Sequence, residues 1–164
     1  MYKENTRGYV PLMRVMLLFV VAVAIQGCHK SETQELYHKF PGSAWERFNL
    51  LSFEVPVKKA AAYDIYLFAR FTPEFQYETL DFNMVMNTPS GEERIHEYQL
   101  EVKSKSGDFS IECSKDSCQG MILLKREINI GKPGILKIEI ENLTPHLSTT
   151  GIKGVGIRLK PSGK

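Results

Sequence analysis

The chain has 164 residues, of which 43% are hydrophobic and 24% are charged. These values are typical of one ordinary globular domain, and they exclude a disordered tail, a collagen-like repeat and a polytopic membrane protein. Residues 1–27 carry three basic side chains against one acidic side chain, so the rest of the chain has 18 of each sign. A formally neutral body offers no electrostatic footprint for a polyphosphate, and nucleic acid is therefore not an expected partner.

An uninterrupted apolar run, VMLLFVVAVAI, occupies residues 15–25. It is too short for an ordinary transmembrane helix, which needs about 20 apolar residues. The run follows Arg7 and Arg14, and this order is typical of a secretory signal peptide. Translation from Met1 and translation from Met13 both fit the pattern.

The run ends in Ile25-Gln26-Gly27-Cys28, which resembles a bacterial lipoprotein signal. The resemblance implies removal of residues 1–27, attachment of a diacylglyceryl group to the Cys28 sulfur, and acylation of the new amino terminus, with palmitate as the expected fatty acid. A thiolate is the nucleophile that such a lipid transfer needs. Two or three acyl chains hold a protein stably on a membrane. The alternative is a buried helix that a cysteine follows by chance.

The remaining chain divides into a polar segment and a strand-rich body. Residues 28–44 are mostly polar and include Pro41 and Gly42, which favours a flexible tether. Residues 45–164 are predicted to form a single domain, because apolar residues there recur with period two rather than 3.6.

Eight short strands are expected in this body. Turn signals such as Pro89-Ser90-Gly91 separate them. About seven to eight antiparallel strands of this kind favour an all-β fold, a β-sandwich or jelly roll. The expected strands cover residues 51–57, 63–71, 80–86, 96–102, 109–113, 121–130, 136–140 and 155–159.

Cys113 and Cys118 enclose the polar turn Ser-Lys-Asp-Ser. In an oxidising compartment such a pair can close a disulfide across a hairpin; two reduced thiols are the alternative. A zinc site is disfavoured, because two further ligands at suitable spacing are missing from the sequence. The four histidines form no metal-binding motif, so no metal or other cofactor is expected. They are His29, His38, His96 and His146.

Aromatic residues are concentrated in the first part of the body. If exposed, they would form a stacking platform for a sugar; the alternative is that they fill the core between two sheets. The candidates for ligand-facing aromatics are Trp45, Tyr66, Phe68 and Tyr77. No nucleophile elbow, phosphate-binding loop or singled-out carboxylate pair is present, so no catalytic residue is predicted and no enzyme is expected.

Four features together resemble the gliding-motility (GldH-like) lipoprotein family of Bacteroidota. They are the lipoprotein signal at Cys28, Trp45 before the first predicted strand, Tyr-x-Ile-x-Leu-x-x-Arg at residues 63–70, and Gly-Ile-x-x-Val-Gly-Ile-Arg-Leu at residues 151–159. The resemblance implies a lipid-anchored lipoprotein of the cell envelope, expected at the outer membrane, that acts through protein contacts in a motility or secretion assembly. The alternative function is a carbohydrate-binding lipoprotein accessory to glycan uptake.

Overall fold

The protein is described by a computed structural model over residues 33–163. Within these residues the chain forms eleven strands and one short 3-10 helix, η1 (Pro41–Ser43), and it contains no helix long and apolar enough to cross a membrane. The strands are β1 (Gln34–Lys39), β2 (Ala44–Glu46), β3 (Leu51–Val57), β4 (Ala61–Phe71), β5 (Thr79–Asn87), β6 (Glu93–Glu101), β7 (Glu112–Ser114), β8 (Ser117–Ile130), β9 (Gly134–Asn142), β10 (Ser148–Thr150) and β11 (Ile152–Pro161).

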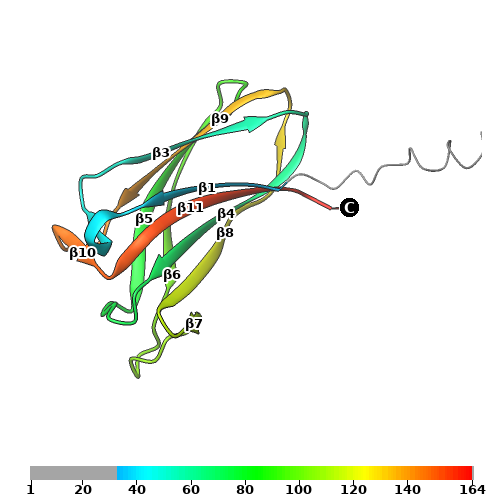
Figure 1. Ribbon diagram of the computed structural model, residues 1–164. Helices are drawn as coiled ribbons and strands as arrows, with labels where there is room; N and C mark the ends of the chain where they lie inside the picture. The colour runs from blue at the N-terminus through cyan, green and yellow to red at the C-terminus, as the bar shows by residue number, and fades with distance from the viewer. Residues whose placement is uncertain (1–32, 164) are drawn as a thin grey trace, which may run out of the picture. The chain divides into compact units, whose positions relative to one another are not determined.

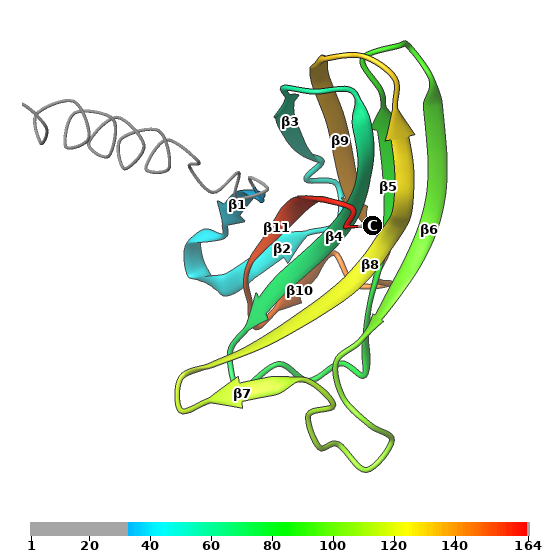
Figure 2. The same ribbon diagram turned by 90° about the vertical axis from the view of Figure 1, so that its right-hand side faces the viewer.

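The strands build two antiparallel sheets that face each other (Figures 1 and 2). One sheet has the order β1-β11-β4-β8-β7 and the other has the order β3-β9-β5-β6, while β2 and β10 form a separate two-stranded ribbon. This arrangement confirms the all-β, sandwich-like fold that the period-two pattern predicts.

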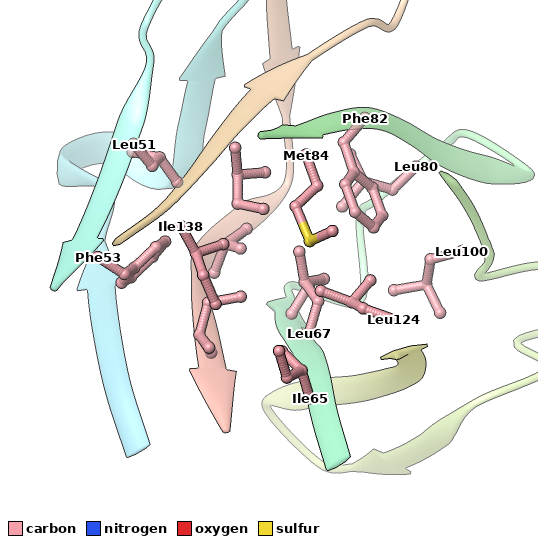
Figure 3. Close-up of a cluster of buried hydrophobic side chains, with 14 of the residues drawn as sticks. Leu51, Phe53, Ile65, Leu67, Leu80, Phe82, Met84, Leu100, Leu124 and Ile138 are labelled. Carbon is pink, nitrogen blue, oxygen red and sulfur yellow. The ribbon is translucent and has the colours of Figure 1, made fainter. Parts of the chain in front are cut away.

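The core lies between the two sheets, where alternate residues of strands such as β3, β5 and β9 point inward (Figure 3). The strand β3 shows the alternation over its whole length, because every second residue from Leu51 to Val57 is buried. The strand β5 does the same from Leu80 to Met86. Side chains that interdigitate from two inner faces form the usual core of a sandwich.

The segment expected to be a flexible tether is part of the fold from residue 34 onward, so this part of the prediction is wrong. All six residues of β1 pair with β11, from Gln34 opposite Leu159 to Lys39 opposite Gly154. An edge strand with one solvated face has little apolar content, and Leu36 is the one aliphatic residue of β1. Residues 28–32 and the predicted signal peptide lie outside the described residues.

Two more strands, β2 and β10, were not predicted because each has three residues, too few to show a period. The predicted strand over 109–113 is shorter in the structure: β7 begins at Glu112, and Phe109 forms an isolated bridge with Lys103. The structure therefore has more strands than the seven to eight expected, and the additions lie where the hydropathy pattern is weakest.

The two ends of the sandwich carry different loops. We call the end at which β1 begins the proximal end and the opposite end the apical end. The loops that follow Val57 and Ile130 lie at the proximal end, since Val57 pairs with Gly134 and Ala61 pairs with Ile130. The apical end holds the loops 47–50 and 143–147, the ribbon β2/β10 and the β7–β8 hairpin. The ribbon lies at the end where β1 finishes, because η1 and β2 follow β1 in the chain and β2 pairs with β10.

A buried polar network fixes the apical ribbon. The Nδ2 of Asn142 donates to the backbone oxygen of Trp45 at 3.2 Å and to Oγ1 of Thr149 at 3.0 Å. The Oγ1 of Thr144 donates to Oδ1 of Asn142 at 2.7 Å. Because every polar atom of the Asn142 amide has a partner, the network can be buried without a large desolvation cost.

Candidate functional site

The outer face of the five-stranded sheet carries an aromatic pair over two glycines. Gly154 and Gly156 of β11 point outward between β1 and β4. The Phe68 ring fills the space that a Cβ on Gly156 would need, and the Tyr37 hydroxyl does the same at Gly154. The two rings stack with centroids 5.8 Å apart and planes 9° apart. Glycine in a strand interior allows such a close approach.

Two arginines extend this pair into a ladder. The guanidinium of Arg70 lies 5.0 Å from the centre of the Tyr37 ring, and that of Arg158 lies 5.8 Å from the centre of the Phe68 ring. Both distances are within the range of cation–π attraction. Arg158 also pairs with Glu35 at 2.6 Å. We call Arg158, Phe68, Tyr37 and Arg70 the outer-face ladder.

Burial raises the pKa of the Tyr37 hydroxyl above its ordinary 10.0, and the positive charge of Arg70 opposes this shift. Burial is the larger cause, so the hydroxyl keeps its proton at neutral pH and can donate a hydrogen bond.

Beside the ladder lies a groove of about 530 Å³ lined by three cationic and three hydroxyl-bearing side chains. We call it the basic groove. A β-bulge supplies one of the cations: Ile152 pairs with Phe71 and Gly154 pairs with Arg70, so Lys153 is an extra residue in β11. An extra residue of this kind re-aims a side chain. The lining residues are Tyr37, Lys39, Ser43, Arg70, Ser117 and Lys153.

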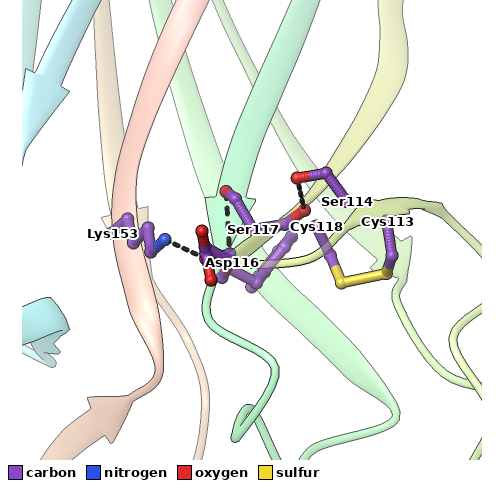
Figure 4. The surroundings of a disulfide bond; sticks show 7 residues. Cys113, Ser114, Asp116, Ser117, Cys118 and Lys153 are labelled. Carbon is purple, nitrogen blue, oxygen red and sulfur yellow. Dashed lines mark hydrogen bonds between the residues drawn. A yellow bond between two sulfur atoms is a disulfide. The ribbon is translucent and has the colours of Figure 1, made fainter.

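The β7–β8 hairpin forms the far wall of a second hollow of about 460 Å³, which shares Arg70 and Ser117 with the basic groove. Cys113 and Cys118 lie directly opposite each other in this hairpin and are joined by a disulfide. Figure 4 shows Lys153 reaching toward the same turn, where its Nζ donates to the backbone oxygen of Asp116. The disulfide thus closes the turn that Lys153 contacts.

The structure does not bring the four candidate aromatics together as a platform. Trp45 is completely buried and Phe68 is 3% exposed, so neither can stack on a ligand. Trp45 points inward from β2 and packs on Phe40, while Phe68 lies under Tyr37. Tyr66 and Tyr77 are half-buried, and Tyr77 packs on Phe75 and His146.

The remaining candidates are dispersed. Cys28 and His29 lie outside the described residues. His38 is on β1, His96 is on β6, and His146 is in an apical loop. Residues 33–163 contain no group of three or more His, Cys, Asp or Glu side chains that could hold a metal ion.

Sequence reasoning missed the side chains that form the basic groove. Tyr37 and Lys39 belong to the predicted tether, and only the register of β1 with β11 places them beside Arg70. One signal was present: Gly154 directly precedes the strand predicted over residues 155–159 and Gly156 lies inside it, and glycine in a strand marks a close approach of another group.

A second exposed feature lies at the apical end. Phe48 is 80% exposed, Leu147 is 72% exposed and Leu50 is 52% exposed. The first two lie in adjoining loops, since the backbone N–H of Arg47 donates to the backbone oxygen of Leu147 at 2.9 Å. We call these three residues the apical apolar cluster.

Comparison with known proteins identifies the family of this chain. No curated protein matches the chain. A solved structure described as Eiger TNF from S. frugiperda is 11% identical, covering 80% of this chain and 92% of that one, with a TM-score of 0.37 that is too low to assign a shared fold. The model of the GldH lipoproteins matches residues 32–159, which is most of the chain. The chain therefore belongs to the GldH lipoprotein family, a family of lipoproteins associated with gliding motility.

Proposed function

We propose that this protein is anchored in the outer membrane by lipid on Cys28 and, without catalysing a reaction, binds a protein partner in a gliding-motility or linked secretion assembly. The lipoprotein signal that ends at Cys28 supports the anchor. Membership of the GldH family supports the cellular context, and this family is not a known enzyme family.

Covalent geometry limits where the anchor can attach relative to the body. Cys28 precedes Gln34 by six positions, and a fully extended chain of that length spans at most about 20 Å. From Gln34, β1 runs toward the apical end for six residues, or roughly 17 Å. A lipid on Cys28 therefore favours an orientation in which the proximal end is nearer the membrane.

The observation that carries the proposal is the apical apolar cluster. Phe48 and Leu147 are each more than 70% exposed. Large apolar groups that are exposed in adjoining loops are typical of interaction sites. Burial of the three side chains of the cluster in a partner would contribute about 5 kcal/mol, taking about 1.5 kcal/mol or more for each. That is enough to make them the central anchors of an interface.

An envelope pull-down tests the proposal. The native lipidated protein is compared with Cys28→Ser, with the double variant Phe48→Ser/Leu147→Ser, and with Ile135→Ser. Ile135 is a matched control because it is 50% exposed on β9, near the proximal end.

We expect one stable partner that Ile135→Ser retains and that both other variants lose. Recovery of the same partner with Phe48→Ser/Leu147→Ser would show that the apical apolar cluster is not the interface. Retention of Cys28→Ser in the membrane fraction, with its partner, would refute the lipid anchor.

A further inference from the structure

The basic groove has an unusual lining: all six side chains can donate a hydrogen bond, and none is a carboxylate. Three are cations, Lys39, Arg70 and Lys153, and three carry hydroxyl groups, Tyr37, Ser43 and Ser117. A hollow of one charge sign concentrates ligands of the opposite sign.

The backbone brings the three cations to one place. Lys39 and Arg70 flank Gly154 in register, one on each neighbouring strand. Because Gly154 has no side chain, no side chain of β11 separates them at that position, and the Tyr37 hydroxyl occupies the space instead. The bulge then adds Lys153 beside Gly154, so three adjacent strands each contribute one positive charge to the same hollow.

The cations keep their capacity to bind an anion. Arg70 donates from Nε to Oε1 of Gln119 at 3.1 Å and lies over the Tyr37 ring. Both contacts orient the guanidinium, and neither neutralises its charge. Lys153 donates to a backbone carbonyl, which is also neutral. Lys39 forms no ion pair within residues 33–163.

Three acidic residues lie near the edge of the groove, and one of them is Asp116, whose backbone oxygen accepts the hydrogen bond from Lys153. Glu112 lines the second hollow, beyond Arg70. Glu74 has a pKa below its ordinary value, mainly because of hydrogen bonds from Thr72 and its own backbone, with a small contribution from Lys153. None of the three lines the basic groove itself.

We propose that the basic groove binds an acidic segment of a protein partner through its side-chain carboxylates, with Lys39, Arg70 and Lys153 as the charged contacts. This inference names the chemistry of a partner and so rests on the proposed function. Arg70 presents a planar fork that matches a carboxylate, and the two lysines supply point charges on either side of it.

The dimensions favour a segment with several charges over a single small anion. The groove has a volume of about 530 Å³ and continues past Arg70 and Ser117 into the second hollow of about 460 Å³. Its charges come from three strands, and neighbouring strands are about 4.8 Å apart. Successive carboxylates of an acidic peptide can therefore meet different cations.

The test uses the purified lipidated full-length protein in detergent and a fluorescein-labelled hexaglutamate peptide, with binding followed by fluorescence anisotropy. The groove variant is Lys39→Gln/Arg70→Gln/Lys153→Gln. The control variant, Lys105→Gln/Lys132→Gln/Lys160→Gln, removes the same charge from exposed lysines outside the groove. The double variant Lys39→Gln/Lys153→Gln keeps the contact between Arg70 and Tyr37, in case the triple variant does not fold.

We expect saturable binding that weakens as salt rises and that falls about tenfold or more in the groove variant, since several exposed charge interactions each contribute a small factor. The control variant should bind like the wild type, and the double variant should lie between them. If peptide binding weakens equally in the groove variant and the control variant, the effect comes from the net charge of the protein and the inference is overturned. Pyrophosphate is tested as a competing small anion. Failure of hexaglutamate to bind, or binding of pyrophosphate without binding of hexaglutamate, would also overturn the inference.

The two proposals fail in different ways. If hexaglutamate does not bind but the pull-down still yields a partner that depends on Phe48 and Leu147, the proposed function stands without the groove. If hexaglutamate binds with the expected variant pattern and no partner is recovered, the groove binds acidic segments and the proposed function is wrong.

Discussion

Replacement of Gly156 by alanine tests how β1 is held against the rest of the sheet. Gly156 lies on β11, opposite Tyr37 of β1 on one side and Phe68 of β4 on the other. A Cβ at this position would lie 2.6 Å from the backbone oxygen of Leu36 and 2.7 Å from Cε1 of Phe68. The Phe68 ring can move aside, but the oxygen belongs to β1, so the strand itself has to shift.

The loss of unfolding free energy in Gly156→Ala depends on whether a side chain or the backbone has to move. Extra atoms in a well-packed region that force a backbone shift typically cost 1–3 kcal/mol, and we expect about 2 kcal/mol for Gly156→Ala. In a body of this size, that loss lowers the Tm by about 6 to 10 °C. It should also loosen the stacking of Tyr37 on Phe68, because both rings lie over this glycine.

Thermal unfolding followed by circular dichroism measures the effect, with Gly131→Ala as the control. A Cβ on Gly131 would meet no atom within 4 Å, so the control should change stability by no more than about 0.5 kcal/mol. Hydrogen exchange should show faster exchange for the β1 amides in Gly156→Ala. Equal Tm values for the two variants, with unchanged exchange in β1, would refute the close approach at Gly156.

Three further predictions concern other parts of the body. Reduction of the Cys113–Cys118 disulfide, which closes a short loop, should cost about 2 kcal/mol or less and leave the far-ultraviolet circular dichroism unchanged; complete unfolding on reduction would contradict this. The backbone N–H of Glu127 and the hydroxyl of Ser162 hold the pKa of Asp64 below its ordinary 3.8, so its stabilisation is present above the unfolded pKa and is lost as pH falls through the lowered folded value. Asp64→Asn should therefore be less stable than the wild type at neutral pH, with a difference in urea midpoint that shrinks below about pH 4; a difference that grows in acid would have the wrong sign. Asn142→Ala leaves its buried partners unsatisfied and should cost about 1–3 kcal/mol by urea titration; an unchanged midpoint would show that the apical network does not stabilise the fold.

The predictable part of the fold is the part in which one face of a strand is buried. In β3 and β5 the alternation is complete, so the sequence identifies both the strands and their inward residues. The edge strand β1 could not be predicted in this way. Its outward residues, including Tyr37 and Lys39, are polar or aromatic, and its inner face contributes Leu36, which is partly buried.

The candidate site depends on register, which a single sequence does not specify. Arg70 and Lys153 are 83 positions apart in the chain and meet because β11 pairs with β4. The bulge that turns Lys153 outward has no marker in the sequence beyond the glycine that follows it. The burial of Trp45 could not be predicted either. It depends on the three-residue strand β2 and on the Asn142 network, neither of which a single sequence shows.

Site-specific photocrosslinking in living cells tests the central claim that the protein is lipid-anchored and binds a partner through its apical end. A photoreactive amino acid is placed at position 48 in one strain and at position 135 in another, each with and without Cys28→Ser. We predict one crosslinked envelope protein from position 48, none from position 135, and loss of the crosslink when Cys28 is serine. The same product from both positions, or a crosslink from position 48 that persists without Cys28, would contradict the account.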